Sequence, residues 1–276
     1  MTLVTLKNTL QNALKNNYAV AGLVTLGWED MRAYVEAAEK ENCPVILQAG
    51  PSCRQHTPLP ILGRMFTYLA ENTSIPVVAH LDHGYSIEEC KIAIDSGFSS
   101  VMYDGSRKSL KENIDKTAKI CEIAHSAGVS CEGEIGFVGY SGGEKSAGTD
   151  PKEAYLFAKT TKIDAMAISV GNVHLQENKE GYLNEDQIRS IEALTDIPLV
   201  IHGGSGVPVK QRMFLSRSSK ICKFNIGTEL RFAFGSALRN AVNSDPSRFD
   251  RVQILKDTHQ PLVDKTRSVL RSFKPV

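Results

Sequence analysis

The chain has 276 residues, which suits one large α/β domain or two small ones, and its 32 Lys and Arg nearly balance its 31 Asp and Glu. This balance gives no overall field that would attract nucleic acid or an anionic membrane surface. Six scattered cysteines without a C-x-x-C pair favour buried thiols in a reducing compartment over a disulfide framework. The chain has no secretory apolar segment and no membrane-spanning run of about 18 apolar residues. We therefore expect a cytoplasmic protein that binds neither nucleic acid nor membranes.

Strand and helix patterns alternate along the whole chain. An amphipathic helix over 1–17 comes first, and eight apolar runs then follow, each with a helical pattern after it. The predicted strands cover residues 18–26, 43–50, 76–84, 98–104, 129–136, 165–174, 198–202 and 221–228. The later predicted helices cover 28–41, 57–74, 86–96, 110–127, 151–160, 185–194, 208–215, 229–243 and 251–272.

This alternation requires a parallel sheet with right-handed crossovers, and eight such units close naturally into a barrel. We predict a (β/α)8 TIM barrel with extra N- and C-terminal helices, forming a single domain over residues 1–276. An open doubly wound sheet is the structural alternative. No G-x-G-x-x-G follows the first strand, which counts against dinucleotide binding.

Histidines close three of the predicted strands, at His83, His174 and His202. Because the carboxyl ends of barrel strands meet at one rim, we expect these three imidazoles to lie together. Three protein ligands with one open position are the pattern of a catalytic zinc site. The sequence therefore predicts a bound Zn2+ at the carboxyl rim.

Carboxylates share this rim with the histidines. Asp82 precedes a predicted ligand and is placed for proton transfer, and we expect the strand direction to separate its side chain from that of His83. Asp104 and Glu134 could hold a second cation or hydrogen-bond the ligands. Glu132 is also placed at the rim.

Two other ionisable residues are predicted to be structural. His80 alternates onto the face of Asp82 and is interpreted as a core histidine or a partner of the ligands. Lys223 lies on the last strand beside apolar residues. Strand six carries no lysine, which weakens a Schiff-base mechanism.

Two glycine- and hydroxyl-rich loops follow predicted strands seven and eight. In barrels these loops often bind phosphate, because backbone N–H groups and hydroxyls surround the anion at a helix start. The candidate phosphate-binding residues are Gly203, Gly204, Ser205, Asn225, Ile226, Gly227 and Thr228.

Six motifs together resemble the class II, zinc-dependent ketose-bisphosphate aldolases, a family that includes fructose- and tagatose-bisphosphate aldolases. They are LDHG (81–84), VMYDGS (101–106), EGEIG (132–136), GNVH (171–174), HGGSG (202–206) and FNIGTEL (224–230). The order and spacing of all six match, so the resemblance covers residues 5–240. It implies reversible aldol cleavage of a phosphorylated ketose to dihydroxyacetone phosphate and an aldehyde.

The resemblance also implies a role for each site residue. It assigns the zinc to the three rim histidines and the proton of the aldol hydroxyl to Asp82. Asp104 and Glu134 match an alternate, buried metal position, and the two glycine-rich loops match the phosphate site. Glu144, in the mobile loop 137–149, matches a glutamate that moves the carbon-bound proton. The family further implies a homodimer or homotetramer, and a monovalent cation near the phosphate site.

Two departures from the family pattern bear on the substrate. Leu175 follows His174 where the family usually has Gly, and strand two ends in Ala49-Gly50-Pro51 where the family often has a Ser. Two alternatives to the aldolase therefore stay open. One is another metal-dependent barrel enzyme such as a hydrolase, which the lack of a His on strand one disfavours. The other is a non-catalytic sugar-phosphate-binding subunit, which Leu175 favours and Asp82 with the three histidines opposes.

Overall fold

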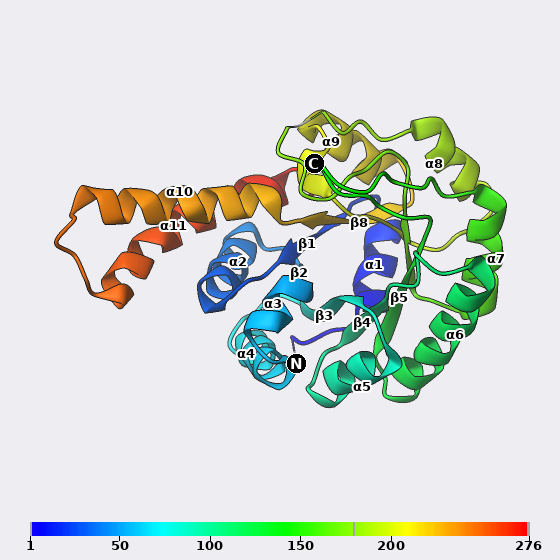
Figure 1. Ribbon diagram of the computed structural model, residues 1–276, viewed down its shortest axis with the longest axis horizontal. Coiled ribbons are helices and arrows are strands. Elements are labelled where there is room, and N and C mark those ends of the chain that lie inside the picture. Colours follow the sequence, from blue (N-terminus) through cyan, green and yellow to red (C-terminus); the bar gives the residue numbers. More distant parts are fainter. Residues whose placement is uncertain (1, 179, 275–276) are drawn as a thin grey trace.

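A computed structural model describes residues 2–178 and 180–274 (Figure 1). Eight parallel strands form a closed barrel in sequence order, and pairing of the first strand with the last closes it. The strands are β1 (Val20–Val24), β2 (Val45–Ala49), β3 (Val77–Gly84), β4 (Ser100–Tyr103), β5 (Ser130–Ile135), β6 (Ala165–Ile168), β7 (Leu199–Ile201) and β8 (Ile221–Ile226). The predicted (β/α)8 barrel is thus confirmed.

Helices surround this barrel and extend beyond it at both ends of the chain. They are α1 (Leu6–Lys15), α2 (Trp28–Glu41), α3 (Pro51–His56), α4 (Leu59–Glu71), α5 (Ile87–Asp95), α6 (Leu110–Ser126), α7 (Pro151–Thr161), α8 (Glu185–Glu192), α9 (Val209–Ser218), α10 (Thr228–Ser244) and α11 (Arg251–Arg271). A short 3-10 turn, η1 (Gly204–Gly206), follows β7.

Helix α1 closes the amino end of the barrel. Its apolar face, made by Leu6, Leu10 and Ala13, joins a buried cluster with strand residues such as Val20 and Ile46. The separate, larger apolar core includes outward-facing strand residues and the surrounding helices. Because α1 fills the amino end, only the carboxyl rim is left open for a site built from strand ends.

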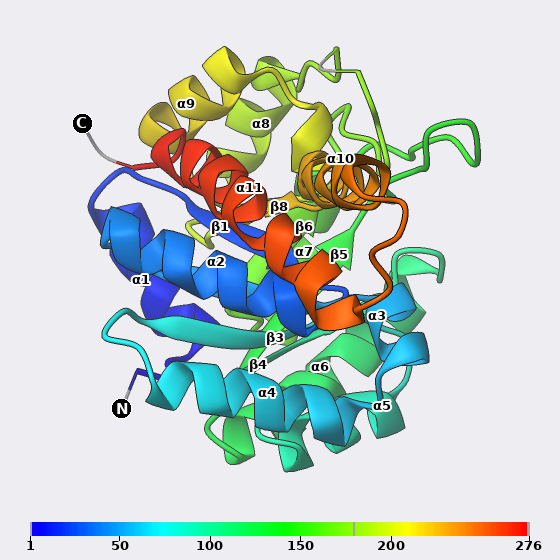
Figure 2. The ribbon, with the colours of Figure 1, turned by 90° about the vertical axis from the view of Figure 1, so that its left-hand side faces the viewer.

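Helices α10 and α11 form a hairpin that projects away from the barrel (Figure 1). The returning helix α11 packs along α2, as the turned view shows (Figure 2). The carboxylate of Glu41, at the end of α2, pairs with Arg267, Arg271 and Lys274. This cluster of charges attaches the C-terminal helices to the barrel.

Two predicted elements differ from the structure for identifiable reasons. The predicted helix over 57–74 is instead two helices, α3 and α4, because the chain is extended at Thr57 and Pro58. The predicted strand over 165–174 ends at Ile168. Gly171 turns the chain with a φ of +103°, and the Asn172 side chain accepts the Val170 N–H.

All six cysteines are free, and five of them are buried. Within residues 2–178 and 180–274, no helix combines the length and the apolar character that crossing a bilayer requires. The single-domain organisation and the cytoplasmic location stay predictions.

Candidate active site

The carboxyl end of β3 brings two ionisable side chains into one cavity. Neighbouring residues of a regular strand point to opposite faces, which would separate Asp82 from His83. Here His83 has a left-handed φ of +53°, and the pairing of β3 with β4 shifts register between Leu81 and Gly84. Both side chains line the same cavity, with His83 Nε2 4.0 Å from Asp82 Oδ1. The predicted separation of the two side chains is therefore wrong. The left-handed conformation of His83 costs about 1–2 kcal/mol.

Three imidazoles meet at the carboxyl rim. The ring centroids of His83, His174 and His202 lie between 4.6 and 5.5 Å apart. One nitrogen from each ring lies within 4.8 Å of the others, so the three rings could hold one metal ion. His174 comes from the loop after β6, not from the strand, and its ring stacks on Tyr140 with centroids 4.9 Å apart.

A second possible metal position shares His83 with two carboxylates. His83 Nδ1 lies 2.8 Å from Asp104 Oδ2 and 3.9 Å from Glu134 Oε2. Glu134 Oε2 also lies 3.3 Å from His202 Nδ1, but neither atom has a hydrogen bond of good geometry among the described residues. Buried polar atoms normally have partners, so these two fit coordination of a cation. Both predicted ligand sets are thus brought together.

The carboxylates around these rings favour a positive charge. Burial alone would lower the pKa of His202, but its contacts with Glu132 and Glu134 raise it, because the two carboxylates favour a positive charge there, either a proton or a metal cation in its place. Burial opposes ionisation of Asp82, yet the neighbouring imidazoles of His83 and His202 lower its pKa. Burial and the same two rings hold the pKa of His174 well below its usual value. His174 is therefore neutral, which is the form that binds metals.

A buried ion pair between Glu132 and Lys223 lies beneath the three histidine rings. Glu132 was expected at the rim, but its carboxylate is fully buried in the barrel, where Oε2 meets Lys223 Nζ at 2.7 Å. Lys223 Nζ also lies 3.3 Å from Nε2 of His80, whose Nδ1 lies 2.8 Å from Ser100 Oγ. Burial and the Lys223 charge lower the pKa of His80 to about 3. His80 is therefore a neutral core histidine, which agrees with the first of the two interpretations drawn from the sequence.

The loops after β7 and β8 come together at the amino end of α10. Gly203 has a left-handed φ of +65°, and a Cβ there would lie 2.1 Å from the Val173 carbonyl oxygen. Ser205 Oγ accepts hydrogen bonds from the N–H groups of Gly227 and Glu229, and no residue in the described part of the chain accepts its own proton, so that proton can be donated to a ligand. The Ile226 side chain is fully buried, so that residue offers only its backbone.

These loops, His83, His174 and Asp82 line one cavity of about 270 Å3. Asn225 lies within it and donates from Nδ2 to Asp82 Oδ1 at 3.3 Å. Leu175 also lines it, with a left-handed φ of +55° and a side chain that is 49% exposed. Leucine here thus keeps a backbone conformation that glycine adopts more easily.

The cavity contains residues that sequence reasoning missed. Tyr140 covers His174, and Arg231 brings a positive charge to the first turn of α10. Arg231 follows FNIGTEL directly, and its Nε has no hydrogen-bond partner among the described residues. The position of Arg231, one helical turn after a predicted phosphate-binding loop, could have identified it as a phosphate-binding residue from the sequence.

Glu144 lies apart from this cavity. Its side chain is 55% exposed at the tip of the loop and pairs with Arg107, whose guanidinium lies over the Phe137 ring. The base of the same loop is attached to the site, because the His174 N–H donates to the Gly139 carbonyl oxygen. Glu144 would therefore reach a bound substrate only if the loop tip moved.

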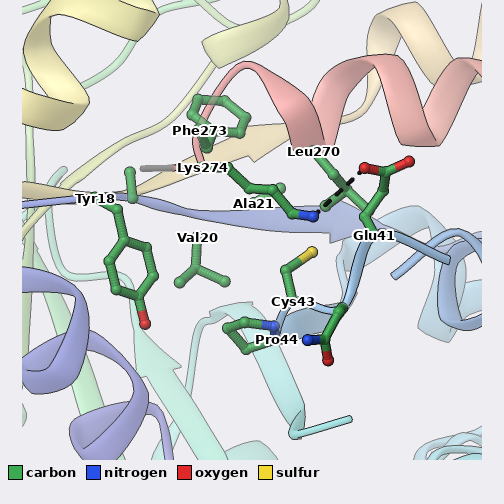
Figure 3. A pocket seen from close by; sticks show the side chains of 11 residues that line it. Tyr18, Val20, Ala21, Glu41, Cys43, Pro44, Leu270, Phe273 and Lys274 are labelled. Carbon is green, nitrogen blue, oxygen red and sulfur yellow. Dashed lines mark hydrogen bonds and ion pairs between the residues drawn. The ribbon is translucent and has the colours of Figure 1, made fainter. Parts of the chain in front are cut away.

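A larger cavity of about 420 Å3 lies at the opposite, amino end of β1 and β2 (Figure 3). The charged residues in its lining are Glu41 and Lys274, which pair with each other at 3.4 Å. It has no histidine and no pair of carboxylates in its lining. This cavity therefore lacks the metal-binding and proton-transferring side chains of the rim cavity, although its volume is larger.

Comparison with known proteins agrees with the geometry. The family model for class-II fructose-bisphosphate aldolase matches residues 4–275. A fructose-bisphosphate aldolase of Geobacillus stearothermophilus is 39% identical over 264 residues, covering 92% of this chain and 91% of that protein. One from Staphylococcus epidermidis is 36% identical over 282 residues, covering 99% and 98%. The crystal structure of the YdjI aldolase from Escherichia coli K12 has a TM-score of 0.85 at 26% identity, covering 98% and 97%.

The barrel and its rim of histidines and carboxylates define a metal-dependent barrel enzyme. The chain belongs to the class II fructose-bisphosphate aldolase family, whose members depend on a metal. The resemblance seen in the six motifs is thereby confirmed, and the protein is an aldolase.

Proposed function

We propose that this aldolase binds zinc through His83, His174 and His202 and cleaves a phosphorylated ketose to dihydroxyacetone phosphate and an aldehyde. The observation that carries the proposal is that three imidazoles meet beside a cavity lined by an ionised Asp82 and by the candidate phosphate-binding loops. The ligands are nitrogen donors, which suit zinc better than magnesium or calcium. Asp104 and Glu134 offer a second position for the same ion.

In this proposal some residues of the site bind the substrate phosphate and another transfers a proton. The N–H groups and hydroxyls of 203–205 and 225–228 bind the phosphate at the amino end of α10, and Arg231 adds a charge there. Asp82 accepts the hydroxyl proton during cleavage and returns it during condensation. A bound zinc ion would act as a Lewis acid that stabilises negative charge on substrate oxygens.

Glu144 is the proposed carrier of the carbon-bound proton. Its pairing with Arg107 at an exposed loop tip supports a role that begins only after substrate has bound. Loop movements of this kind commonly complete a catalytic site and exclude water. We also propose a homodimer or homotetramer and a monovalent cation near the phosphate, both on family resemblance alone.

The test combines metal content with a panel of ketose phosphates that includes fructose 1,6-bisphosphate and tagatose 1,6-bisphosphate. We expect about one zinc per chain, release of triose phosphate from at least one member, and loss of activity on chelation with recovery on adding zinc. Tight binding of panel members without any triose release would overturn the proposed cleavage of these ketose phosphates. Full activity in a zinc-free protein after chelation would overturn the metal assignment.

A further inference from the structure

Arg54, in α3, makes an unusual set of contacts with the backbone beneath the active site. Its side chain is only 6% exposed. Nη1 donates to the carbonyl oxygens of Ala49 at 3.2 Å and Asp82 at 2.8 Å, and Nη2 donates to that of His83 at 2.5 Å. One guanidinium therefore joins the end of β2 to both active-site residues of β3.

Glu89 completes the contact from the other side. Its Oε1 accepts from Arg54 Nε at 2.5 Å, and its Oε2 accepts from the Tyr85 N–H at 2.9 Å. Glu89 is itself fixed at the start of α5, because its N–H donates to Ser86 Oγ. The Arg54–Glu89 pair thus holds residues 82–85 at three backbone groups: two carbonyls and one N–H.

This segment needs such support, because its backbone is not in a regular strand conformation. His83 is left-handed, which disfavours a residue with a Cβ, and pairing with β4 shifts register here. An extended His83 would turn its carbonyl and its side chain elsewhere. Arg54 binds the carbonyls of Asp82 and His83 in the left-handed arrangement seen in the structure.

We propose that Arg54 is a positioning residue that holds the turn at His83 and so keeps Asp82 and His83 directed into one cavity. Arg54 is not among the residues that line that cavity, so it acts through the backbone of its neighbours. A planar guanidinium can bind several carbonyls in fixed directions, whereas an ammonium group cannot. The inference rests on the proposed metal site at His83.

The experiment compares the variants Arg54→Met and Arg54→Lys with the unaltered protein. Zinc affinity is measured by chelator competition, ligand geometry by the visible spectrum of the cobalt-substituted protein, and kinetics with the best substrate of the panel. Loss of a partner that orients a metal ligand typically weakens metal binding about 10–100-fold. We expect that loss and a comparable fall in kcat in both variants, with a changed cobalt spectrum. KM should stay within about threefold, because Arg54 does not contact the phosphate loops.

Two further variants separate positioning from general loss of stability. Arg267→Met removes an ion-pair partner of Glu41 far from the rim, so it should lower Tm without changing zinc affinity or the cobalt spectrum. Glu89→Gln keeps the shape of the pair but not its charge, and we expect a smaller, severalfold loss of zinc affinity. It decides the question if Arg54→Met does not fold.

Unchanged zinc affinity and cobalt spectrum in folded Arg54→Met, or in Glu89→Gln if Arg54→Met fails to fold, would overturn the proposed role. An unaltered protein that binds no zinc would overturn the metal site itself. The two failures are therefore distinguishable.

Discussion

Lys223 Nζ lies 2.7 Å from Glu132 Oε2 inside the barrel, where neither side chain is exposed to solvent. The other oxygen of Glu132 lies 3.3 Å from His202 Nε2, so the pair forms the floor of the candidate metal site. Burial opposes ionisation of Glu132, but the adjacent Lys223 charge lowers the pKa of its carboxyl. The two charges therefore depend on each other.

We expect Lys223→Met to destabilise the protein by about 3–5 kcal/mol, because it leaves the Glu132 carboxylate buried without its cation. Urea unfolding of the metal-free protein measures this change without a contribution from zinc. The double variant Lys223→Met, Glu132→Leu removes both charges and should recover much of the loss. A single variant that loses less than about 1 kcal/mol would show that Lys223 does not compensate Glu132.

The three rim histidines are expected to contribute jointly to metal binding. His83→Ala, His174→Ala and His202→Ala should each lower zinc occupancy sharply, since each removes one of three proposed ligands. Metal analysis of the purified proteins measures the occupancy. His56→Ala, an exposed histidine of α3, is the matched control and should retain full zinc. Full occupancy and activity in any one ligand variant would remove that residue from the site.

Asp82→Ala should retain zinc but lose kcat by about two orders of magnitude or more, as expected for loss of a general acid or base. Steady-state assays of triose phosphate release measure kcat. Near-normal turnover would reduce Asp82 to a structural carboxylate. Borohydride added with substrate gives an independent check, because irreversible inactivation would indicate a lysine imine instead of metal catalysis.

The sequence predicted the architecture well, because the alternation of apolar runs and helical patterns persists through eight units. It also predicted that the three histidines and Asp82 lie at one rim, because the carboxyl ends of parallel strands share an edge. The resemblance to a known family selected the chemistry among several that a rim of histidines could support.

The remaining errors arise where backbone conformation departs from the regular period. Side-chain alternation separates Asp82 from His83, but a left-handed His83 cancels that alternation. Glu132 is a different case: its place near the end of a predicted strand suggested the rim, but it lies in the middle of β5 and its side chain points into the barrel to Lys223. Arg54 gave no signal, because its contacts with β2 and β3 are made to backbone carbonyl groups, which every residue has.

Acid stability should depend on Glu41, which is 8% exposed at the end of α2. Burial alone would raise its pKa, but Arg271, Arg267 and Lys274 lower that pKa to about 2. A lowered carboxyl pKa stabilises the folded state above the ordinary value of about 4.5, and this contribution is lost as pH falls toward 2.

Glu41→Gln should therefore be less stable than the unaltered protein at pH 7, by about 1–2 kcal/mol after allowance for the solvent-exposed partners. The difference should shrink between pH 4.5 and 2, the interval set by the ordinary and folded pKa values. Urea unfolding at several pH values measures it. A difference that stays constant with pH would mean that Glu41 contributes packing and not charge.

Leu175 is expected to influence both stability and substrate choice. It combines a left-handed φ of +55° with a side chain that lines the rim cavity next to His174. Leu175→Gly should relieve the backbone strain and raise stability by about 1 kcal/mol. It should also admit a substrate that comes closer to the loop, and change the ratio of kcat/KM for fructose 1,6-bisphosphate and the best panel substrate about tenfold or more.

Leu175→Ala separates the two effects of this substitution. Alanine removes most of the apolar bulk but keeps the Cβ, so it should change substrate preference without the gain in stability. If glycine shifts the kcat/KM ratio and alanine does not, the approach of the backbone to the substrate sets specificity. If both shift it alike, the leucine side chain itself occupies the space. If neither variant moves either kcat/KM value by more than about twofold, Leu175 has no part in substrate choice.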